Sequence, residues 1–489
     1  MTRPKVVVKK TETFSIAFLE AVDNVDLLLT HGYFLYEDPK EQAVMKPYPP
    51  LGLLYLSSYL KSFGFDVEVF DTTFSTPDAF AQYVAQHRPP IVGLYCNLMT
   101  RVQALRQIQV CKQHGAHVVV GGPEPAQYAE EYLAHGADVV VIGEGEATML
   151  ELVPHLTRHG TNALEDLQGI AYRDADGRIV QNAPRPYLDD LDALPFPDRD
   201  AIDLDQYLDV WRTHHGRSSV SLITARGCPY TCTWCSHAVY GYSHRRRSPE
   251  NVADEVAYIV ERYDPDALWY ADDVFAIKPS WFFKYADELK RRGLRLPFET
   301  ISREDRLNED VVRTLAEMGC FRLWVGSESG SQRILDAMKR RTDARRVQEM
   351  IRLVQRFGIE AGLFIMLGYE GEEEEDLFKT VAHLKAAPPD VFLTTVSYPI
   401  KGTPYYEQVK DRIIAQKGWH EGSDRDFTVA GRRSQRYYRF ANRWMVNAVA
   451  VERARSRANP DYLTVAKGLL KANAGRLGMW ATRHEVEHG

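Results

Sequence analysis

The chain has 489 residues, of which 45% are hydrophobic and 26% are charged. This usage is that of a globular protein of two to four domains and excludes a disordered, collagen-like or coiled-coil chain. No apolar run approaches the ~20 residues that span a bilayer, and the net charge of −7 is too mild to indicate nucleic acid or any other partner.

Residues 24–155 alternate strand and helix patterns and are predicted to form the first domain. Residues 51–63 and 101–114 have helical spacing, and short apolar runs that predict buried strands lie at 26–30, 67–71, 91–96, 117–120 and 138–142. Five such strands separated by helices predict a doubly wound parallel sheet, in which ligands bind outside the carboxyl ends of the strands. The polar or glycine residues that follow these strands are Asn97, Gly121, Gly122, Gly143 and Glu144.

These glycines allow backbone to approach a ligand closely, or they only make tight turns. No G-x-G-x-x-G follows a strand, so a dinucleotide fingerprint is absent. Residues 156–217 are expected to connect the first domain to the next. Within them, 167–172 and 178–180 predict a hairpin that turns at Asp176-Gly177.

Residues 218–410 repeat the strand–helix pattern and are predicted to form a second domain. Strands are expected at 220–224, 268–270, 298–301, 323–325, 362–366 and 391–396, and helices at 249–263, 280–292, 309–318 and 344–357. Six such units predict a parallel barrel or part of one, whose chemistry belongs at the carboxyl ends of the strands. The polar residues there are Asp272, Asp273, Ser302, Arg303, Glu328 and Ser329.

Three cysteines lie directly after the first strand of this repeat. Cys228, Cys232 and Cys235 form C-x3-C-x2-C, and three thiolates on one tight loop are soft ligands that suit iron–sulfur or zinc. A closed zinc site needs a fourth ligand. Those available are Cys96, Cys111, Cys320 or a histidine such as His237, none of which has paired-ligand spacing. The alternative is a cluster with three protein ligands and one open iron.

The segment ARGCPYTCTWC at 225–235 resembles the cluster motif of radical S-adenosylmethionine (SAM) enzymes. The resemblance implies a [4Fe-4S] cluster on Cys228, Cys232 and Cys235, whose open iron binds the amino and carboxylate groups of SAM. An electron from an external flavodoxin- or ferredoxin-type donor would then split SAM into methionine and a 5′-deoxyadenosyl radical. The cluster needs reducing conditions, so we expect a cytoplasmic location.

Further segments of the second domain carry the same resemblance. VGSESGSQRIL at 325–335 implies contacts of Glu328 and Ser329 with the SAM ribose, and FIMLGYEGEEEEDL at 364–377 resembles the adenine-contact segment, although Tyr369-Glu370 stands where the family more often has proline. The other SAM-site residues implied are Trp234 near the adenine, Asp273 in YADDVF at 270–275, and Arg303 on the SAM carboxylate. Alternatively, each acid or arginine pairs with another barrel residue.

The first domain resembles the cobalamin-binding domain of cobalamin-dependent radical SAM proteins. The segments that carry this resemblance are PYPPLGLLYLSSYLKSFGFDVEVFDTT at 47–73, VVVGGPEPA at 118–126 and VVVIGEGEATMLEL at 139–152. It implies bound cobalamin, with the corrin faced by Asn97, Thr100, Gly121, Gly122, Gly143 and Glu144. The Asp-x-His-x-x-Gly motif is absent, so the lower cobalt ligand is not indicated. The alternative is a degenerate domain that keeps the fold without the cofactor.

Together the two resemblances imply an enzyme that methylates an unactivated carbon of a small-molecule or lipid substrate. Methylcobalamin would donate the methyl group to a substrate radical, and a second SAM would restore it. The alternatives are cyclisation or oxidation, as in the anaerobic magnesium-protoporphyrin ester cyclase, and a B12 or iron–sulfur sensor without catalysis. A tRNA methylthiotransferase needs three more cluster cysteines, whereas only Cys96 and Cys111 precede the second domain.

Residues 411–489 are expected to be a helical region on the substrate side. Residues 432–476 hold eleven Arg/Lys and two acids, and Tyr437, Phe440 and Trp444 have helical spacing. This predicts a helix that docks its aromatic stripe on the barrel and leaves its basic face in water. The alternative is a surface for an anionic substrate, carrier or membrane. The sequence does not identify the substrate.

Overall fold

The computed structural model describes residues 26–456 and 461–488, so residues 24 and 25 of the expected first domain lie outside the described part. The chain divides into two compact units. The first holds the residues up to Ser221 together with His237–Pro265, and the second holds Leu222–Ser236 together with the residues from Asp266 onward.

The sheet of the first unit confirms the predicted doubly wound architecture. Its strand order is β2-β1-β3-β4-β5-β6-β7, and β1 pairs in parallel with both β2 and β3. The order therefore reverses between β1 and β3, which is where ligands bind in such sheets. Its strands are β1 (Asp26–His31), β2 (Asp66–Phe70), β3 (Ile91–Tyr95), β4 (His117–Gly121), β5 (Val139–Val141), β6 (Ile170–Arg173) and β7 (Ile179–Gln181).

The predicted hairpin is present, but it adds to this sheet. β6 and β7 pair antiparallel, and β6 also pairs antiparallel with β5. The sheet therefore has seven strands where the sequence patterns indicated five. The hairpin extends the sheet because Ile170 and Tyr172 are apolar and buried, and they join the same core as the parallel strands.

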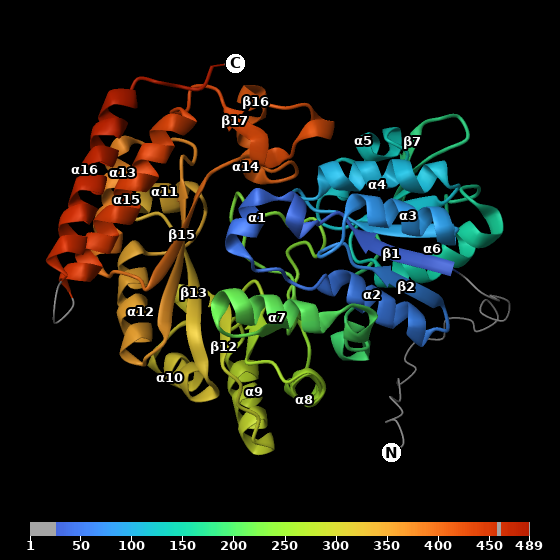
Figure 1. The fold of residues 1–489 in the computed structure, drawn as a ribbon, viewed down its shortest axis with the longest axis horizontal. Coiled ribbons are helices and arrows are strands. Elements are labelled where there is room, and N and C mark those ends of the chain that lie inside the picture. Colours follow the sequence, from blue (N-terminus) through green and yellow to red (C-terminus); the bar gives the residue numbers. More distant parts are fainter. Residues whose placement is uncertain (1–25, 457–460, 489) are drawn as a thin grey trace. The chain divides into compact units, whose positions relative to one another are not determined.

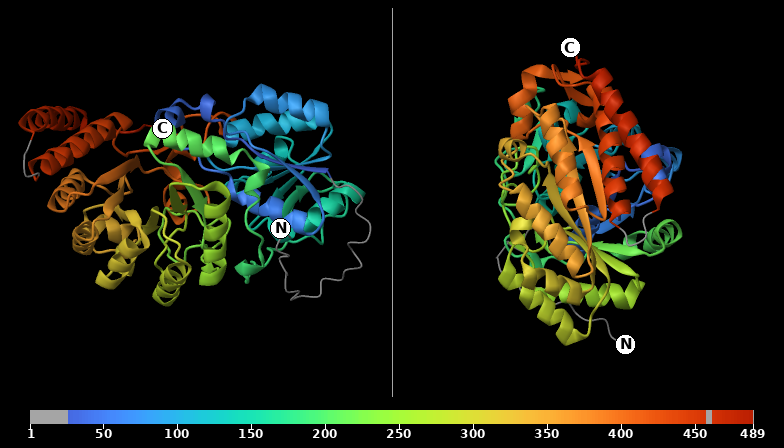
Figure 2. Two further views of the ribbon diagram at one scale, coloured as in Figure 1. Left: turned by 60° about the horizontal axis from the view of Figure 1, so that its bottom comes forward. Right: turned by 90° about the vertical axis from the view of Figure 1, so that its left-hand side faces the viewer.

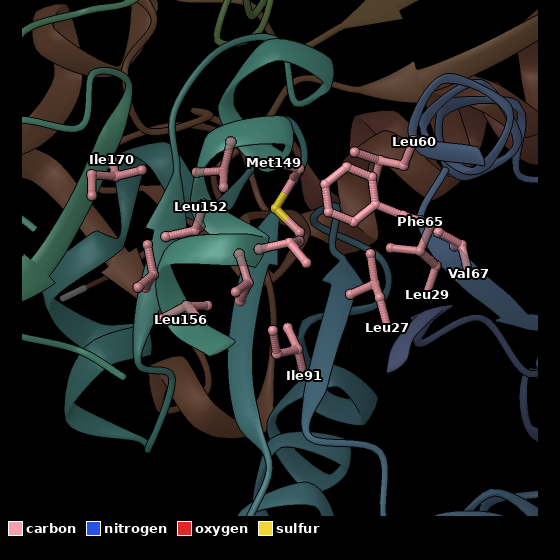
Figure 3. Packing of buried hydrophobic residues seen from close by; sticks show 14 of the residues in the cluster. Leu27, Leu29, Leu60, Phe65, Val67, Ile91, Met149, Leu152, Leu156 and Ile170 are labelled. Atoms are coloured by element: carbon pink, nitrogen blue, oxygen red, sulfur yellow. The ribbon is translucent and has the colours of Figure 1, made fainter. Parts of the chain in front are cut away.

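The core of the first unit lies where helices α2 and α6 cover one face of the sheet. Figure 3 shows Leu27, Leu29 and Ile91 on the strands packed toward Met149 and Leu152 of α6. Parallel strands covered by helices are rich in Val, Leu and Ile because little of them contacts water. The helices of this unit are α1 (Pro39–Val44), α2 (Leu51–Ser62), α3 (Pro77–His87), α4 (Arg101–Gln113), α5 (Ala129–Ala134), α6 (Glu146–His159), α7 (Leu204–His215) and α8 (Pro249–Tyr263).

The second unit is organised by a six-stranded sheet of order β15-β14-β13-β12-β11-β8. Consecutive strands from β11 to β15 pair in parallel with one another. This sequential order confirms the predicted partial barrel. The strands are β8 (Ser219–Leu222), β11 (Ala267–Tyr270), β12 (Phe298–Ser302), β13 (Cys320–Glu328), β14 (Glu360–Leu367) and β15 (Val391–Val396), and short strands are β9 (Ala225–Arg226), β10 (Arg245–Arg246), β16 (Ile413–Ala415) and β17 (Phe427–Val429).

Helices alternate with these strands and lie on the outer side of the curved sheet (Figures 1 and 2). Most of them begin where a capping side chain satisfies a free backbone N–H group, as Asn308 does for α10 by accepting from the N–H of Val311. The helices are α9 (Pro279–Arg292), α10 (Glu309–Met318), α11 (Gln332–Ala337), α12 (Ala344–Arg356), α13 (Glu374–Ala386), α14 (Pro404–Val409), α15 (Gln435–Arg455) and α16 (Tyr462–Thr482).

The C-terminal region is mainly helical, as predicted, but α14 is followed by the antiparallel pair β16–β17 before the long helices. The expected aromatic stripe is divided. Tyr437 and Trp444 are buried, and Trp444 packs on Phe378 of α13 with ring centroids 4.7 Å apart. Phe440 turns instead toward α16, where a Cβ on Gly478 would lie 2.3 Å from its ring. Within the described residues, no helix is long and apolar enough to cross a membrane.

Candidate functional site

The cysteine loop begins at the carboxyl end of β8. The N–H of Thr224 donates to Oδ1 of Asp272 at 2.6 Å, and the Thr224 hydroxyl donates to Oδ2 at 2.5 Å. Asp272 follows β11 and is buried, so its carboxylate fastens the start of the loop to the neighbouring strand. Gly227 then adopts a φ of +85°, which glycine alone adopts without strain, and the chain turns into Cys228.

The three thiols of the loop are electrostatic neighbours. Burial and the nearby Asp273 and Cys232 raise the pKa of Cys228 to about 11. A hydrogen bond with Cys232, followed by burial, raises the pKa of Cys235 well above its usual range. The thiolate form is therefore disfavoured in the chain alone, and a bound cation would favour it because coordination deprotonates thiols.

An arginine and a tyrosine brace one side of the loop. The Arg303 guanidinium lies 3.8 Å from the ring centroid of Tyr230, a cation–π contact. Arg303 also donates from Nε to Asp305 at 2.9 Å and from Nη2 to the carbonyl of Arg340 at 3.0 Å. Its Nη1 is buried and has no hydrogen-bond partner in the structure. Two of the three guanidinium nitrogens of Arg303, which was predicted to bind the SAM carboxylate, therefore donate within the protein. Nη1 remains as a donor for a ligand.

Two tyrosines brace the other side of the loop. The hydroxyl of Tyr369 lies 2.6 Å from that of Thr233, and the N–H of Tyr405 donates to the Thr233 carbonyl at 2.8 Å. The two tyrosine rings stack with centroids 4.8 Å apart. Trp234 packs against the buried cluster that contains both rings. The residue between Cys232 and Trp234 is thereby fixed to the ends of β14 and α14.

Glu328 ends β13 in a strained conformation. Its φ is +59°, a left-handed value that non-glycine residues rarely adopt, and the β13–β14 register shifts there. Burial, with a smaller contribution from Cys232, raises the pKa of its carboxyl to about 8. Arg340 Nε lies 3.8 Å from Glu328 Oε1. Strained, buried acids of this kind concentrate at functional sites.

The remaining predicted SAM-site residues differ in exposure. Asp273 is exposed next to Cys228, whereas Ser329 is fully buried. The Ser329 hydroxyl lies 3.2 Å from that of Thr380 and accepts from the N–H of Ser331. Contacts of Ser329, Asp273, Trp234, Arg303 and Glu328 with SAM stay predictions, and the partners of Ser329 favour the alternative of a role inside the barrel.

In the first unit, Asn97 and Thr100 form a turn between β3 and α4. Oδ1 of Asn97 accepts from the N–H groups of Met99 and Thr100, and the Thr100 hydroxyl accepts from the N–H of Asn97 at 3.0 Å. Met99 is exposed at the tip of this turn. Because the turn follows β3, it lies beside the position where the strand order reverses.

The glycines after β4 and β5 lie at the same edge of the sheet. Gly122 has a φ of +110°, and a Cβ there would lie 2.4 Å from the carbonyl oxygen of Cys96. Gly143 has a φ of +89°. Gly121, the last residue of β4, accepts from the N–H of Cys96 through its carbonyl. This edge therefore depends on the absence of side chains, and its binding role stays a prediction.

Glu144 is held by partners within the first unit. Its Oε2 accepts from Arg245 Nη1 at 2.8 Å and from the N–H of Leu188 at 2.9 Å. The Arg245 guanidinium in turn lies 4.7 Å from the ring centroid of Tyr187. Glu144 is buried, so its carboxylate fixes the segment after β5. Its contact with the corrin stays a prediction.

Sequence reasoning missed two residues that shape the cysteine loop and its surroundings. Arg340 is buried and donates to the carbonyl of Gly326 at 2.8 Å. Thr233 receives the contacts of Tyr369 and Tyr405. The contact of Thr233 could have been suspected only from Tyr369, which stands where proline was expected. Arg340 lies in a basic stretch whose composition is that of an ordinary protein surface.

The three cysteines outside the motif are buried with other partners. Cys96 Sγ lies 2.9 Å from the Tyr132 hydroxyl, and Cys320 Sγ donates to the carbonyl of Arg322. Cys111 is buried on α4. Across residues 26–456 and 461–488, no group of three or more His, Cys, Asp or Glu side chains is arranged to hold a single metal ion.

Comparison with known families matches both parts of the chain. Residues 43–153 match the family model of the B12 binding domain, and residues 222–384 match that of the radical SAM superfamily. The chain is a radical SAM protein with a B12-binding domain. A radical SAM domain takes a [4Fe-4S] cluster and SAM, and the three neighbouring thiols are a donor set that fits such a cluster.

Relatives of this radical SAM protein have different activities. It is 27% identical over 398 residues to the uncharacterized methyltransferase PH0819 of Pyrococcus horikoshii. This alignment covers 78% of this chain and 84% of that protein. It is 26% identical over 376 residues to the anaerobic magnesium-protoporphyrin IX monomethyl ester cyclase of Rubrivivax gelatinosus. This alignment covers 75% of this chain and 67% of the cyclase.

The fold also matches a solved structure. The cobalamin-dependent S-adenosylmethionine radical enzyme OxsB, solved with aqua-cobalamin bound, aligns with a TM-score of 0.73 at 17% identity, over 96% of this chain and 73% of OxsB. At this identity the match shows a shared fold. It includes the B12-binding domain, the radical SAM domain and the helical C-terminal region.

Proposed function

We propose that this radical SAM enzyme, with cobalamin bound to its first unit, methylates an unactivated carbon of a small-molecule or lipid substrate. One observation carries the proposal: a loop of three neighbouring thiols at the carboxyl end of β8 occurs in the same chain as a B12-binding domain. Of the two relatives described, the methyltransferase matches over the larger share of its own length.

The cofactors supply the radical and the methyl group when bound, and the protein positions and shields them. Cys228, Cys232 and Cys235 would hold the cluster. Asp272 and Tyr369 keep the loop between fixed points on β11 and β14, so the thiols need little reorganisation. Burial raises the pKa of the Glu328 carboxyl to about 8, and its oxygens would accept hydrogen bonds from the SAM ribose.

Cyclisation or oxidation is the second proposal, because the cyclase of Rubrivivax gelatinosus is a relative of nearly equal identity. The two reactions differ in how they use SAM. Methyl transfer consumes one SAM as methyl donor and another as radical source, whereas an oxidative ring closure consumes SAM only as radical source. Formation of S-adenosylhomocysteine therefore separates the two reactions.

The test uses anaerobically purified full-length protein from cells supplied with hydroxocobalamin. Iron, sulfide and cobalt are counted per chain, and the protein is then incubated with a reductant, trideuteromethyl SAM and a small-molecule extract. Methyl transfer gives 5′-deoxyadenosine, S-adenosylhomocysteine and a product heavier by the labelled methyl group. Only 5′-deoxyadenosine would favour cyclisation or oxidation, and neither nucleoside, with iron and cobalt retained, would favour a sensor.

A cysteine variant controls for unspecific iron. Cys232→Ala is expected to lose the cluster iron and all SAM cleavage but to keep cobalt. Cys111→Ala changes a buried cysteine of the first unit and is expected to keep both metals. We further propose that a flavodoxin- or ferredoxin-type protein supplies the electron in a reducing, cytoplasmic setting, which the oxygen sensitivity of such clusters supports.

A further inference from the structure

The exposed face of α16 is apolar. Leu470 is 72% exposed, Leu477 is 68% exposed and Trp480 is 62% exposed. Tyr462 and Leu463, at the start of the helix, are exposed as well. Leu463, Leu470 and Leu477 recur every seven residues, so they form one stripe along the helix. Single exposed leucines are normal on a protein surface, but a continuous stripe marks a contact site.

The opposite face of α16 explains why this stripe points outward. Gly468, Gly475 and Gly478 face α15 so closely that a Cβ would lie within 2.3–2.7 Å of Val451, Trp444 or Phe440. The small residues therefore fix which side of α16 packs on α15, and the large residues must lie on the other side. Figure 1 shows α16 beside α15 at the outer edge of the helical region.

Basic residues border the stripe, and the acid at its start is Asp461, the N-cap of α16. The residues of α15 and α16 include eight Arg or Lys and one acid, Glu452. At about 100° per residue, Lys467 and Lys471 lie along one edge of the stripe and Arg476 along the other. The Arg476 guanidinium lies 5.2 Å from the ring centroid of Phe378, which holds it at that edge.

We propose that the exposed face of α16 docks on an anionic lipid membrane surface. Large apolar residues flanked by Lys and Arg are the composition of helices that lie in the membrane interface, where the apolar side chains enter the lipid and the cations contact the headgroups. The charge argues against a second copy of this chain as the occupant. A two-fold pairing of this face would bring the same basic residues together.

The experiment measures binding of the full-length protein to vesicles by sedimentation. Vesicles of phosphatidylcholine with phosphatidylglycerol are compared with vesicles of phosphatidylcholine alone. We expect roughly tenfold stronger binding to the anionic vesicles, weakening as salt is raised. Leu470→Gln with Leu477→Gln is expected to weaken binding by at least about tenfold, because each loses the burial of one apolar side chain. Lys467→Gln with Lys471→Gln is expected to remove the preference for anionic lipid.

Val44→Gln is the matched control, because Val44 is about half exposed on α1 and lies outside every site described. It is expected to bind like the unchanged protein. All variants should keep their iron content and far-ultraviolet circular dichroism, which shows that they fold. The proposal is overturned if the anionic vesicles are not bound, if the leucine variant binds them equally well, or if sedimentation reveals a dimer that the leucine variant abolishes.

Discussion

The hydroxyl of Tyr369 lies 2.6 Å from the hydroxyl of Thr233, the residue that follows Cys232 in the cysteine loop. Tyr369 stands at the end of β14, in the segment where the radical SAM family more often has proline. A proline could not make this bond. The chain thus uses a side-chain hydrogen bond from a residue just after the end of β14 to position its cysteine loop.

Replacing Tyr369 by phenylalanine should loosen the cysteine loop without unfolding the protein. The lost hydrogen bond is worth about 1 kcal/mol, so we expect iron to be removed by a chelator several times faster from Y369F. The release rate is followed by absorbance under anaerobic conditions. Tyr83→Phe, on the exposed side of α3, removes a different tyrosine hydrogen bond and should leave the rate unchanged.

Glu328 should lower the stability of the fold and strengthen the binding of SAM. Glu328→Gly removes a left-handed non-glycine residue and a buried carboxyl, so the free energy of unfolding should rise by about 1 kcal/mol. The same change should weaken SAM binding about tenfold or more, because the hydrogen bonds to the carboxyl group are lost. Calorimetric titration and denaturant unfolding measure the two effects.

Arg88 offers the matched control for Glu328, because it is an exposed residue with a φ of +45° at the end of α3. Arg88→Gly should raise stability without changing SAM affinity. Unchanged SAM affinity in E328G would contradict the predicted ribose contact and leave Glu328 with a structural role alone.

The buried ion pairs of Glu255 should dominate the stability of the first unit. Its two oxygens accept from Arg199 at 2.6 Å and from Arg247, and all three side chains are buried. Glu255→Gln leaves two buried cations without their anion, and we expect a loss of about 3–5 kcal/mol in unfolding free energy. Glu349→Gln, which breaks an exposed pair with Arg346, should cost less than about 1 kcal/mol.

Protonation of His383 should destabilise the second unit in acid. Its ring lies 3.1 Å from the Ser327 hydroxyl and 3.1 Å from Gln348 Nε2, and burial lowers its pKa to about 4. The unfolded chain binds this proton near pH 6.5, so stability falls as pH drops from about 6.5 to about 4, by about 3 kcal/mol in total. His383→Gln should flatten this part of the stability–pH curve, and an unchanged slope would be evidence against it.

Gly122 should be required for cobalamin. Gly122→Ala adds a Cβ 2.4 Å from the Cys96 carbonyl oxygen at a φ of +110°, which forces the turn after β4 to shift. We expect cobalt per chain to fall strongly while cluster iron is retained. Gly52→Ala, where a Cβ meets nothing within 4 Å, is the control and should retain both. Full cobalt in G122A would place the corrin away from this turn.

The strands and helices were largely predictable because burial and periodicity are local properties of the sequence. Helix α10 spans Glu309–Met318, the range that its helical pattern predicted. The addition of β6 and β7 to the first sheet was not predictable, because edge pairing is decided by which neighbouring strand is free. The course of residues 413–429 also escaped prediction, since strands of three residues carry no clear period.

The candidate site was predictable only where chemistry restricts the residue type. Three cysteines on one loop predict a metal or cluster site from their spacing alone. The role of an acid or arginine depends instead on its partners in space. Ser329 is an example: its sequence context resembles a SAM contact, yet its hydroxyl meets Thr380 and Ser331. Thr233 is the converse, because nothing in its type distinguishes it from any other loop threonine.

The first unit draws on both matched families, with consequences for how such proteins can recombine. Arg247 lies in the region that matches the radical SAM superfamily, yet its Nη1 donates to the hydroxyl of Tyr55 at 3.3 Å, and Tyr55 lies in the region that matches the B12 binding domain. A gene fusion that replaced residues 43–153 alone would leave Arg247 facing a foreign surface. A chimera that exchanges the B12-binding domain should therefore exchange residues 237–265 with it, because they belong to the same compact unit.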